Sequence, residues 1–157
     1  MNAPAGGFRV RELSVADLDR VTEIGESLSQ APHWPRRVYD AVLDPASPRR
    51  LALVAEVPAT GMIVGFAVAG ILPPQAELET IAVPEKEQRR GIGSKLLAAM
   101  VEELRTAGVR EFILEVRASN QRALGFYRSL GWSETGRRPR YYADPEEDAV
   151  LMSLELR

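Results

Sequence analysis

Hydrophobic and polar positions recur with two different periods along the chain, and each period predicts one kind of element. A period of two residues is typical of strands, and a period near 3.6 is typical of helices. Two runs rich in Val, Ala, Leu and Ile on either side of "PATG" predict a hairpin. The predicted strands span residues 8–13, 51–57, 62–72, 76–83, 110–117, 132–136 and 149–155. The predicted helices span residues 14–30, 37–43, 91–106 and 120–130.

Cap and turn signals separate the first two helices. Ser14 with Asp17 three residues later is typical of a helix N-cap, and the prolines that flank His33 and Trp34 end this helix. The resulting order, β-α-α-β-β-β-α-β-α-β-β, predicts an α/β protein of the α+β kind, with a mixed sheet and helices on both faces. We expect residues 1–157 to form a single domain. The early meander of strands argues against a doubly wound nucleotide-binding fold.

Composition and charge narrow the classes of function. The 157 residues include 20 basic and 22 acidic side chains, for a net charge of -2, which does not favour binding to nucleic acid. No apolar run reaches the length of a membrane span, and "MNAPAGGFRV" lacks the order of a signal peptide, so we expect a cytoplasmic location. The absence of cysteine excludes a thioester on the enzyme and a thiolate metal ligand, and we expect no metal.

The stretch "EKEQRRGIGSKLLAAM" places Gly91 and Gly93 in front of a helical pattern. Glycines let a ligand approach the backbone closely, and the unpaired N–H groups of a first helical turn attract anions. The pattern is neither a dinucleotide fingerprint, because position 96 is Leu, nor a P-loop, because the chain reads "GSKL". Gly-x-Gly alone is equally compatible with a tight turn, so the wider context has to decide.

That wider context resembles the acetyl-CoA signature of the GNAT acetyltransferases. In "IAVPEKEQRRGIGSKLL", a strand is followed by Gln-Arg-Arg-Gly-Ile-Gly and then by a helix. Downstream, "LEVRASNQRALGFYRSLGW" is similar to the second half of that family, with a strand, an Asn-led helix and a tyrosine before "SLG". The closing "GRRPRYYADPEEDAVLMSLEL" resembles the RimI-type N-terminal alanine acetyltransferases of ribosomal protein. The likeness is strong over residues 76–157 and fainter before them.

The resemblance implies a GNAT fold with acetyl-CoA bound at this junction. The pantetheine arm is expected along residues 81–83 and the pyrophosphate over the amides of residues 89–94. Backbone N–H groups suit both parts, because they cradle phosphate oxygens and pair with amides as an added strand does. The residues that we assign to acetyl-CoA binding are Ile81, Ala82, Val83, Gln88, Arg89, Arg90, Gly91, Ile92, Gly93, Ser94, Asn120 and Tyr127.

Two residues are candidates for proton transfer. Tyr127 shares one helical face with apolar residues, so it is either a core aromatic or, as the resemblance implies, the acid that protonates the departing CoA thiolate. Glu115 lies in the apolar strand "FILEVR", where a carboxylate is costly unless it is paired or useful. A salt bridge with Arg117 on the same face is one interpretation. The matching glutamate of RimI-type enzymes is the general base, which is the other.

The residues that bind the acceptor amine are harder to identify from the sequence than those that bind acetyl-CoA. Glu77 and Glu79 lie on the strand that leads to the cofactor and are rivals to Glu115 as the base; they are also candidates for holding a cationic acceptor. Tyr141 and Tyr142 are candidates for the acceptor mouth. We expect the nearby arginines to form a solvated rim. These are Arg137, Arg138 and Arg140.

These residues predict an N-acetyltransferase that acts by direct attack in a ternary complex. The resemblance implies that the acceptor is a protein N-terminal α-amine, in particular the N-terminal alanine of a small-subunit ribosomal protein. Two alternatives stay open: an acetyltransferase for a small amine or a lysine side chain, and a non-catalytic acetyl-CoA sensor, which the presence of both Glu115 and Tyr127 disfavours. A monomer and a weak dimer are both compatible with the sequence.

Overall fold

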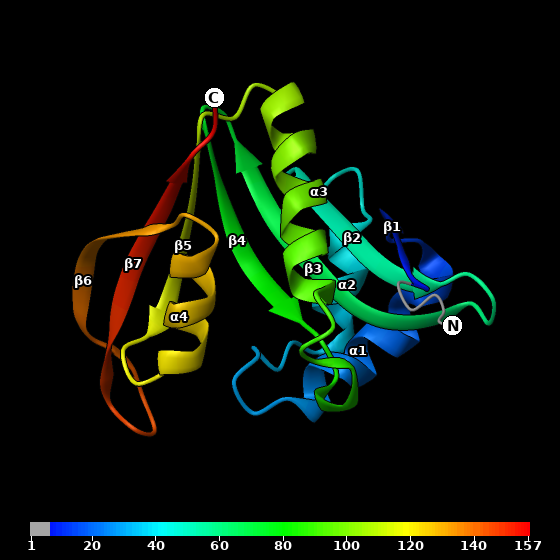
Figure 1. Ribbon diagram of the computed structural model, residues 1–157, viewed down its shortest axis with the longest axis horizontal. Coiled ribbons are helices and arrows are strands. Elements are labelled where there is room, and N and C mark those ends of the chain that lie inside the picture. Colours follow the sequence, from blue (N-terminus) through cyan, green and yellow to red (C-terminus); the bar gives the residue numbers. More distant parts are fainter. Residues whose placement is uncertain (1–6) are drawn as a thin grey trace.

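The computed structural model describes residues 7–157 and contains one mixed sheet covered on both faces by helices (Figure 1). Residues 1–6, on which part of the signal-peptide argument rests, lie outside the described range. The spatial order of the strands is β1-β2-β3-β4-β5-β7-β6. The strands are β1 (Arg9–Glu12), β2 (Arg50–Val57), β3 (Met62–Leu72), β4 (Gln75–Ala82), β5 (Glu111–Arg117), β6 (Ser133–Tyr142) and β7 (Glu147–Glu155).

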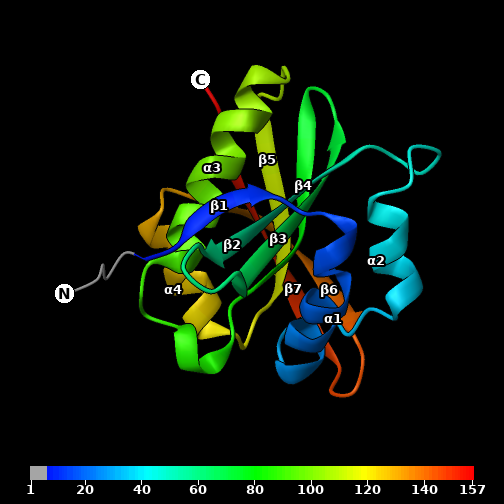
Figure 2. The same cartoon turned by 90° about the vertical axis from the view of Figure 1, so that its right-hand side faces the viewer.

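Helices form one layer on each face of the sheet, as the two perpendicular views show (Figures 1 and 2). α3 and α4 pack with one core cluster, which contains Met100, Phe112 and Tyr127, and α1 and α2 pack with a second, which contains Ile24 and Tyr39. No helix in the described part of the chain is both long and apolar enough to cross a membrane. The helical segments are η1 (Val15–Asp17), α1 (Leu18–Ser27), α2 (Arg36–Val42), η2 (Glu85–Glu87), α3 (Ile92–Thr106) and α4 (Gln121–Ser129).

The predicted element order and mixed sheet are confirmed, and the main difference is the length of β6. This strand was expected to end near Gly136 but continues to Tyr142. Its residues are almost all exposed, because β6 is an edge strand and pairs only with β7. Hydrophobic alternation, the signal that predicts strands, is therefore missing from its second half.

The start of α1 is held by buried polar contacts around Asp17. Its carboxylate accepts hydrogen bonds from the Ser14 backbone N–H at 2.8 Å and from the Arg11 guanidinium at 2.8 and 2.9 Å. The Asp17 side chain is 6% exposed. The predicted cap is therefore present as a capping box, extended by an ion pair to β1.

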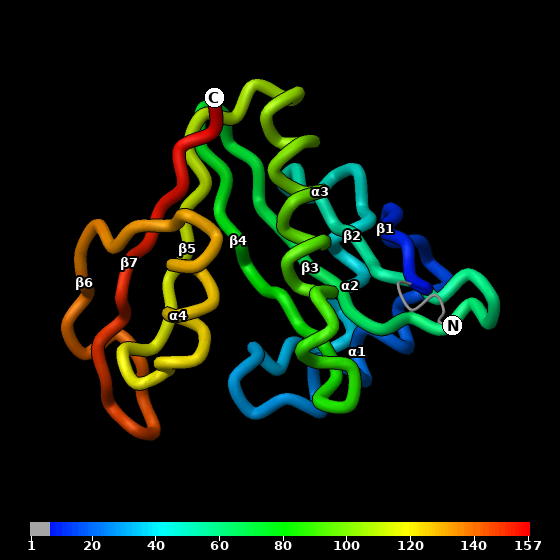
Figure 3. Tube along the Cα trace, in the orientation of Figure 1, coloured from blue at the N-terminus to red at the C-terminus, as the bar shows by residue number. Residues whose placement is uncertain are grey.

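The sheet opens between β4 and β5, its parallel pair. Only three residue pairs join these strands, and the last is Glu77 with Ile113. A bulge in β4 leaves Glu79 as an extra residue opposite β3, because Val68 pairs with Thr80 while Ala69 pairs with Leu78. Beyond this point the two strands diverge in a V (Figures 1 and 3). Both strands thus present backbone edges to the space between them.

Candidate active site

The loop between β4 and α3 presents unpaired backbone N–H groups. Gly91 is the N-cap of α3 in the left-handed conformation, with φ 79°, and supplies no side chain to cap the helix. Arg89 also has a positive φ, of 67°. The Gln88 side chain donates a hydrogen bond to the Val83 carbonyl at 2.9 Å, which ties the loop back to the end of β4. An uncapped first turn held in this way is suited to bind phosphate groups.

The two glycines of the loop have different roles. A Cβ at Gly91 would meet no atom within 4 Å, so its backbone angle is what requires glycine there. A Cβ at Gly93 would lie 3.2 Å from the Phe126 ring, while the Gly93 φ is not in the left-handed region. Gly93 therefore permits close packing of α3 against α4. Packing, and not an unusual backbone angle, accounts for glycine at this position.

Other residues assigned to acetyl-CoA contribute mainly through the backbone. Ile92 and Ala82 are buried, so their side chains belong to the core and only their amides are available. Arg89 and Arg90 are exposed, and the Arg90 guanidinium is paired with Glu87. Asn120 caps α4, because its Oδ1 accepts a hydrogen bond from the Ala123 N–H at 3.1 Å.

Tyr127 lies on α4 in a cluster of aromatic rings. Its ring is 5.3 Å from that of Phe126 and 5.6 Å from that of Trp132, centroid to centroid, and the residue is 7% exposed. Burial raises the pKa of the Tyr127 phenol, so the hydroxyl keeps its proton at neutral pH. The ring is a core aromatic, and a protonated hydroxyl at the edge of this core is suited to donate a proton.

Glu115 lies on β5 and faces away from its neighbours Leu114 and Val116, which are buried in the same core cluster as Tyr127. Glu115 Oε2 is 2.7 Å from the Arg138 Nε. Arg138 therefore does not belong to a simple solvated rim. A salt bridge between Glu115 and Arg117, one of the two interpretations of Glu115, is wrong in its partner, because Arg117 pairs with Glu147 at 3.1 Å. The turn between β6 and β7 brings Glu147 to the end of β5.

The two glutamates of β4 have different surroundings. Glu79 is paired with Arg50, with Oε1 2.7 Å from the Arg50 Nε. The pKa of Glu77 is raised, first by partial desolvation and then by the negative charges of Glu115 and Glu79, while the charge of Arg138 acts in the opposite direction. Glu77 and Glu115 thus share one electrostatic environment.

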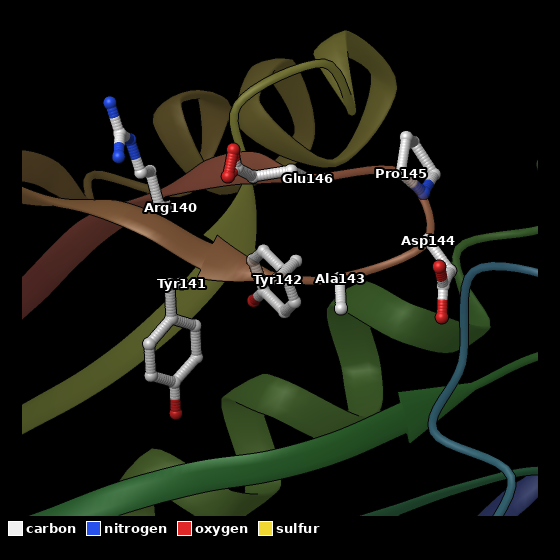
Figure 4. A pocket seen from close by; sticks show the side chains of 7 residues that line it. All are labelled: Arg140, Tyr141, Tyr142, Ala143, Asp144, Pro145 and Glu146. Carbon is white, nitrogen blue, oxygen red and sulfur yellow. The ribbon is translucent and has the colours of Figure 1, made fainter.

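Tyr141 and Tyr142 belong to a segment that lines a hollow of about 320 Å³ (Figure 4). Arg140 and Tyr141 point in opposite directions in this view, and Tyr141 is 52% exposed. The Tyr142 ring lies 5.1 Å from the Tyr141 ring and under the Arg117 guanidinium, 4.5 Å from its carbon. The hollow is lined by Arg140, Tyr141, Tyr142, Ala143, Asp144, Pro145 and Glu146.

Glu115 and Tyr127 lie on opposite faces of the sheet, next to the opening between β4 and β5. A carboxylate on one face, a phenol on the other and an uncapped helix start at the same opening are the groups that acyl transfer to an amine requires. Among residues 7–157, no group of His, Asp or Glu side chains is arranged to hold a metal ion.

Comparison with known proteins identifies the family. Residues 16–132 match the family model described as "Acetyltransferase (GNAT) family", and the chain belongs to this family. GNAT acetyltransferases use acetyl-CoA, and the chain is an acetyl-CoA-dependent N-acetyltransferase.

Several relatives carry a more specific name. The [ribosomal protein bS18]-alanine N-acetyltransferase of Salmonella typhimurium is 36% identical over 92% of this chain and 95% of its own. The putative enzyme of the same name from Bacillus subtilis is 32% identical over 91% of this chain and 92% of its own. The crystal structure of the Escherichia coli ribosomal-protein-S18-alanine N-acetyltransferase superposes with a TM-score of 0.83 at 32% identity, covering 95% of this chain and 94% of the other.

The sequence argument missed the cations that face the acidic residues of the site. Arg138 and Arg50 pair with Glu115 and Glu79 across neighbouring elements. No local motif marks either arginine, since each pairing depends on how the strands are ordered in the sheet. The one available signal was that three glutamates in partly apolar strands each need a positively charged partner, which indicates that arginines lie nearby but not which ones.

Proposed function

We propose that this enzyme transfers the acetyl group of acetyl-CoA to the α-amine of a protein N-terminus, namely the N-terminal alanine of the small-subunit ribosomal protein bS18. The observation that carries the proposal is the similarity to enzymes of that name, at 36% identity over nearly the full length of both chains. An acceptor of this kind also places the reaction in the cytoplasm.

The residues at the sheet opening suit acetyl-CoA as the acyl donor. Bound acetyl-CoA supplies a thioester whose carbonyl carbon accepts the amine. The uncapped N–H groups at Gly91–Ser94 would hold the pyrophosphate, and the open edge of β4 at residues 81–83 would pair with the amides of the pantetheine arm. The absence of cysteine leaves direct attack within a ternary complex as the route.

Each step of proton transfer has a residue suited to it. The amine nitrogen forms a bond to the carbonyl carbon while the N–H of Val83 polarises the carbonyl oxygen. Glu115, directly or through one water, accepts the proton that the amine loses. The carbon–sulfur bond then breaks, and Tyr127 donates its proton to the leaving sulfur. The raised pKa of Tyr127 keeps that proton available.

The α-amine is favoured over a lysine side chain by its acidity. Near pH 7.5 about a third of α-amines, with a pKa near 7.8, are already neutral, against about one in a thousand lysine amines, with a pKa near 10.4. A carboxylate that carries a paired arginine, as Glu115 does, suits the first task. Of the two glutamates on β4, Glu79 is already paired with Arg50, so Glu77 is the one that could hold a basic second residue of the acceptor behind the amine.

Peptides that begin Ala-Arg and contain an internal lysine test the proposal, with the terminus free or blocked. We expect acetylation of the free peptide only, with mass spectrometry mapping the label to the α-nitrogen. If the blocked peptide is acetylated as fast, with the label on lysine, the enzyme is a side-chain acetyltransferase. Turnover of small amines alone would support the small-amine alternative, and acetyl-CoA binding without any turnover would support a sensor.

A further inference from the structure

Arg138 lies at the point where the edge strand β6 becomes irregular. It pairs with Ala149 of β7, and the register then shifts before the next pair, Tyr142 with Glu147. The Arg138 guanidinium points across β7 to Glu115 of β5 and lies 5.8 Å from the centre of the Tyr141 ring. Its side chain is 58% exposed, while that of Glu115 is 19% exposed. An exposed cation therefore reaches inward to a largely buried carboxylate.

The ion pair with Arg138 compensates the charge of Glu115, but it does not form a hydrogen bond to the Glu115 carboxylate. Glu115 Oε2 is buried and accepts no hydrogen bond from the described residues, although the Arg138 Nε is 2.7 Å away, because the N–H is not directed at the oxygen. The other oxygen, Oε1, makes no hydrogen bond within the described residues and is not buried in this way, so it is the oxygen that can meet an incoming amine or water.

Arg138 also offsets the other negative groups around Glu115. Glu77 on β4 and Tyr142 on β6 both lie within electrostatic range of Glu115. Glu79 is neutralised by Arg50, whereas Glu77 has no ion pair within residues 7–157. Arg138 is thus the cation whose charge acts on both Glu77 and Glu115.

We propose that Arg138 is a positioning residue for acetyl transfer: it holds one oxygen of Glu115 and maintains the carboxylate as a charged proton acceptor directed at the acceptor amine. This inference rests on the proposed role of Glu115 as the base. An exposed ion pair contributes little, but removing the cation from a buried carboxylate leaves an uncompensated charge. Loss of Arg138 therefore acts on the ionisation and orientation of Glu115.

The test compares Arg138→Gln and Arg138→Lys with the matched control Arg137→Gln. Arg137 is the adjacent residue, is 52% exposed and pairs with Glu134 on the surface, so its loss changes the net charge equally. With the free Ala-Arg peptide, we expect Arg138→Gln to lower kcat at least about tenfold, in the range for a misplaced proton acceptor. The loss should appear in kcat more than in KM, and Arg138→Lys should recover most of the rate.

Acetyl-CoA affinity should stay near the value of the control, since Arg138 is not among the residues proposed to bind the cofactor. In a Glu115→Gln background, Arg138→Gln should cause no further loss, because the group through which it acts is gone. The proposal is overturned if Arg138→Gln matches Arg137→Gln in kcat, or if its full effect persists in the Glu115→Gln background.

A measurement without turnover separates this proposal from the proposed function. The Arg138 Nε–H signal, assigned by its absence in Arg138→Lys, should shift in the ¹⁵N spectrum of Glu115→Gln and stay in place in a Glu134→Gln protein. If wild-type enzyme acetylates no peptide but this shift occurs, the acceptor assignment fails while the contact stands. An unchanged Arg138 signal in Glu115→Gln shows that the contact is absent and overturns the proposal even if the enzyme is active.

Discussion

Gly93 and Phe126 lie so close together that a methyl group on Gly93 would be 3.2 Å from the Phe126 ring. The first turn of α3 and the middle of α4 are therefore in direct contact at the proposed phosphate site. Ile81 of β4 lies on the same side, 3.9 Å from that position. A small residue at position 93 allows these three elements to meet.

Replacement of Gly93 by Val is expected to abolish acetyl-CoA binding. The branched side chain would push α3 away from Phe126 and fill the space in front of the first-turn N–H groups. Titration calorimetry measures the affinity directly. Gly125→Ala is the control, because a Cβ there meets no atom within 4 Å and alanine favours the helix. Unchanged affinity in Gly93→Val would exclude the phosphate-site assignment.

Tyr127→Phe should lower turnover by about a hundredfold to ten-thousandfold, the usual range for a positioned acid, while acetyl-CoA affinity is kept. Its ring contacts with Phe126 and Trp132 remain, so the melting temperature should change little. Because burial raises the pKa of Tyr127, the wild-type profile should show no loss of this acid in the neutral range. A large fall in melting temperature with normal turnover would show that Tyr127 is structural only.

Glu115→Gln should also lower turnover by about a hundredfold or more without loss of the fold, since the amide cannot accept the amine proton. Steady-state kinetics as a function of pH checks this. If Glu77→Gln shows this loss and Glu115→Gln does not, the base is on β4.

Glu77→Gln is expected to act mainly on acceptor affinity. Glu77 has no ion pair within the described residues, so its carboxylate is available to a basic group of the acceptor, whose positive charge would oppose the desolvation that raises the Glu77 pKa. The KM for an Ala-Arg peptide should rise about tenfold to a hundredfold, the scale of a hydrogen bond to a charged group, with kcat nearly unchanged. An Ala-Gln peptide serves as the comparison. If the substitution raises the KM equally for both peptides, Glu77 does not recognise the second residue of the acceptor.

Asp17→Asn should reduce the free energy of unfolding by about 1–3 kcal/mol at pH 7, because the hydrogen-bonded carboxylate is lost. The hydrogen bond from Arg11, helped by the Ser14 N–H, lowers the pKa of Asp17. Its stabilisation is thus present above the unfolded pKa of about 3.9 and is lost as the pH falls through the lower folded value.

Urea denaturation at several pH values measures this difference. Asp19→Asn is the control, since the Asp19 side chain is 90% exposed and its ion pair is expected to contribute little. The difference between wild type and Asp17→Asn should shrink below about pH 3. A difference that stays constant down to that pH would contradict the assignment.

The parts of the site that lie in one continuous segment were predictable from the sequence. Gln88, Gly91 and Gly93 belong to a single junction, where local rules about glycine and helix starts apply. Tyr127 and Glu115 were found because a polar group on an apolar pattern stands out.

The contacts between strands could not be predicted in the same way. Glu115 is next to Arg138 because β7 lies between β5 and β6, and Arg117 pairs with Glu147 because a turn returns there. The bulge at Glu79 depends on how β3 and β4 pair, and the exposed half of β6 carries no alternation of hydrophobic residues.

The short pairing of β4 with β5 makes the distance between Glu115 and Tyr127, the two residues proposed to transfer protons, a property of the whole sheet. Only Gln75–Glu77 and Glu111–Ile113 join the halves, so the angle at which they diverge is set by the packing around this seam. A core substitution near Phe112 or Leu78 would widen or narrow that angle. It would thereby change the distances from Glu115 and Tyr127 to the reacting carbonyl. Residues that never contact a substrate thus control the distances over which the two protons are transferred.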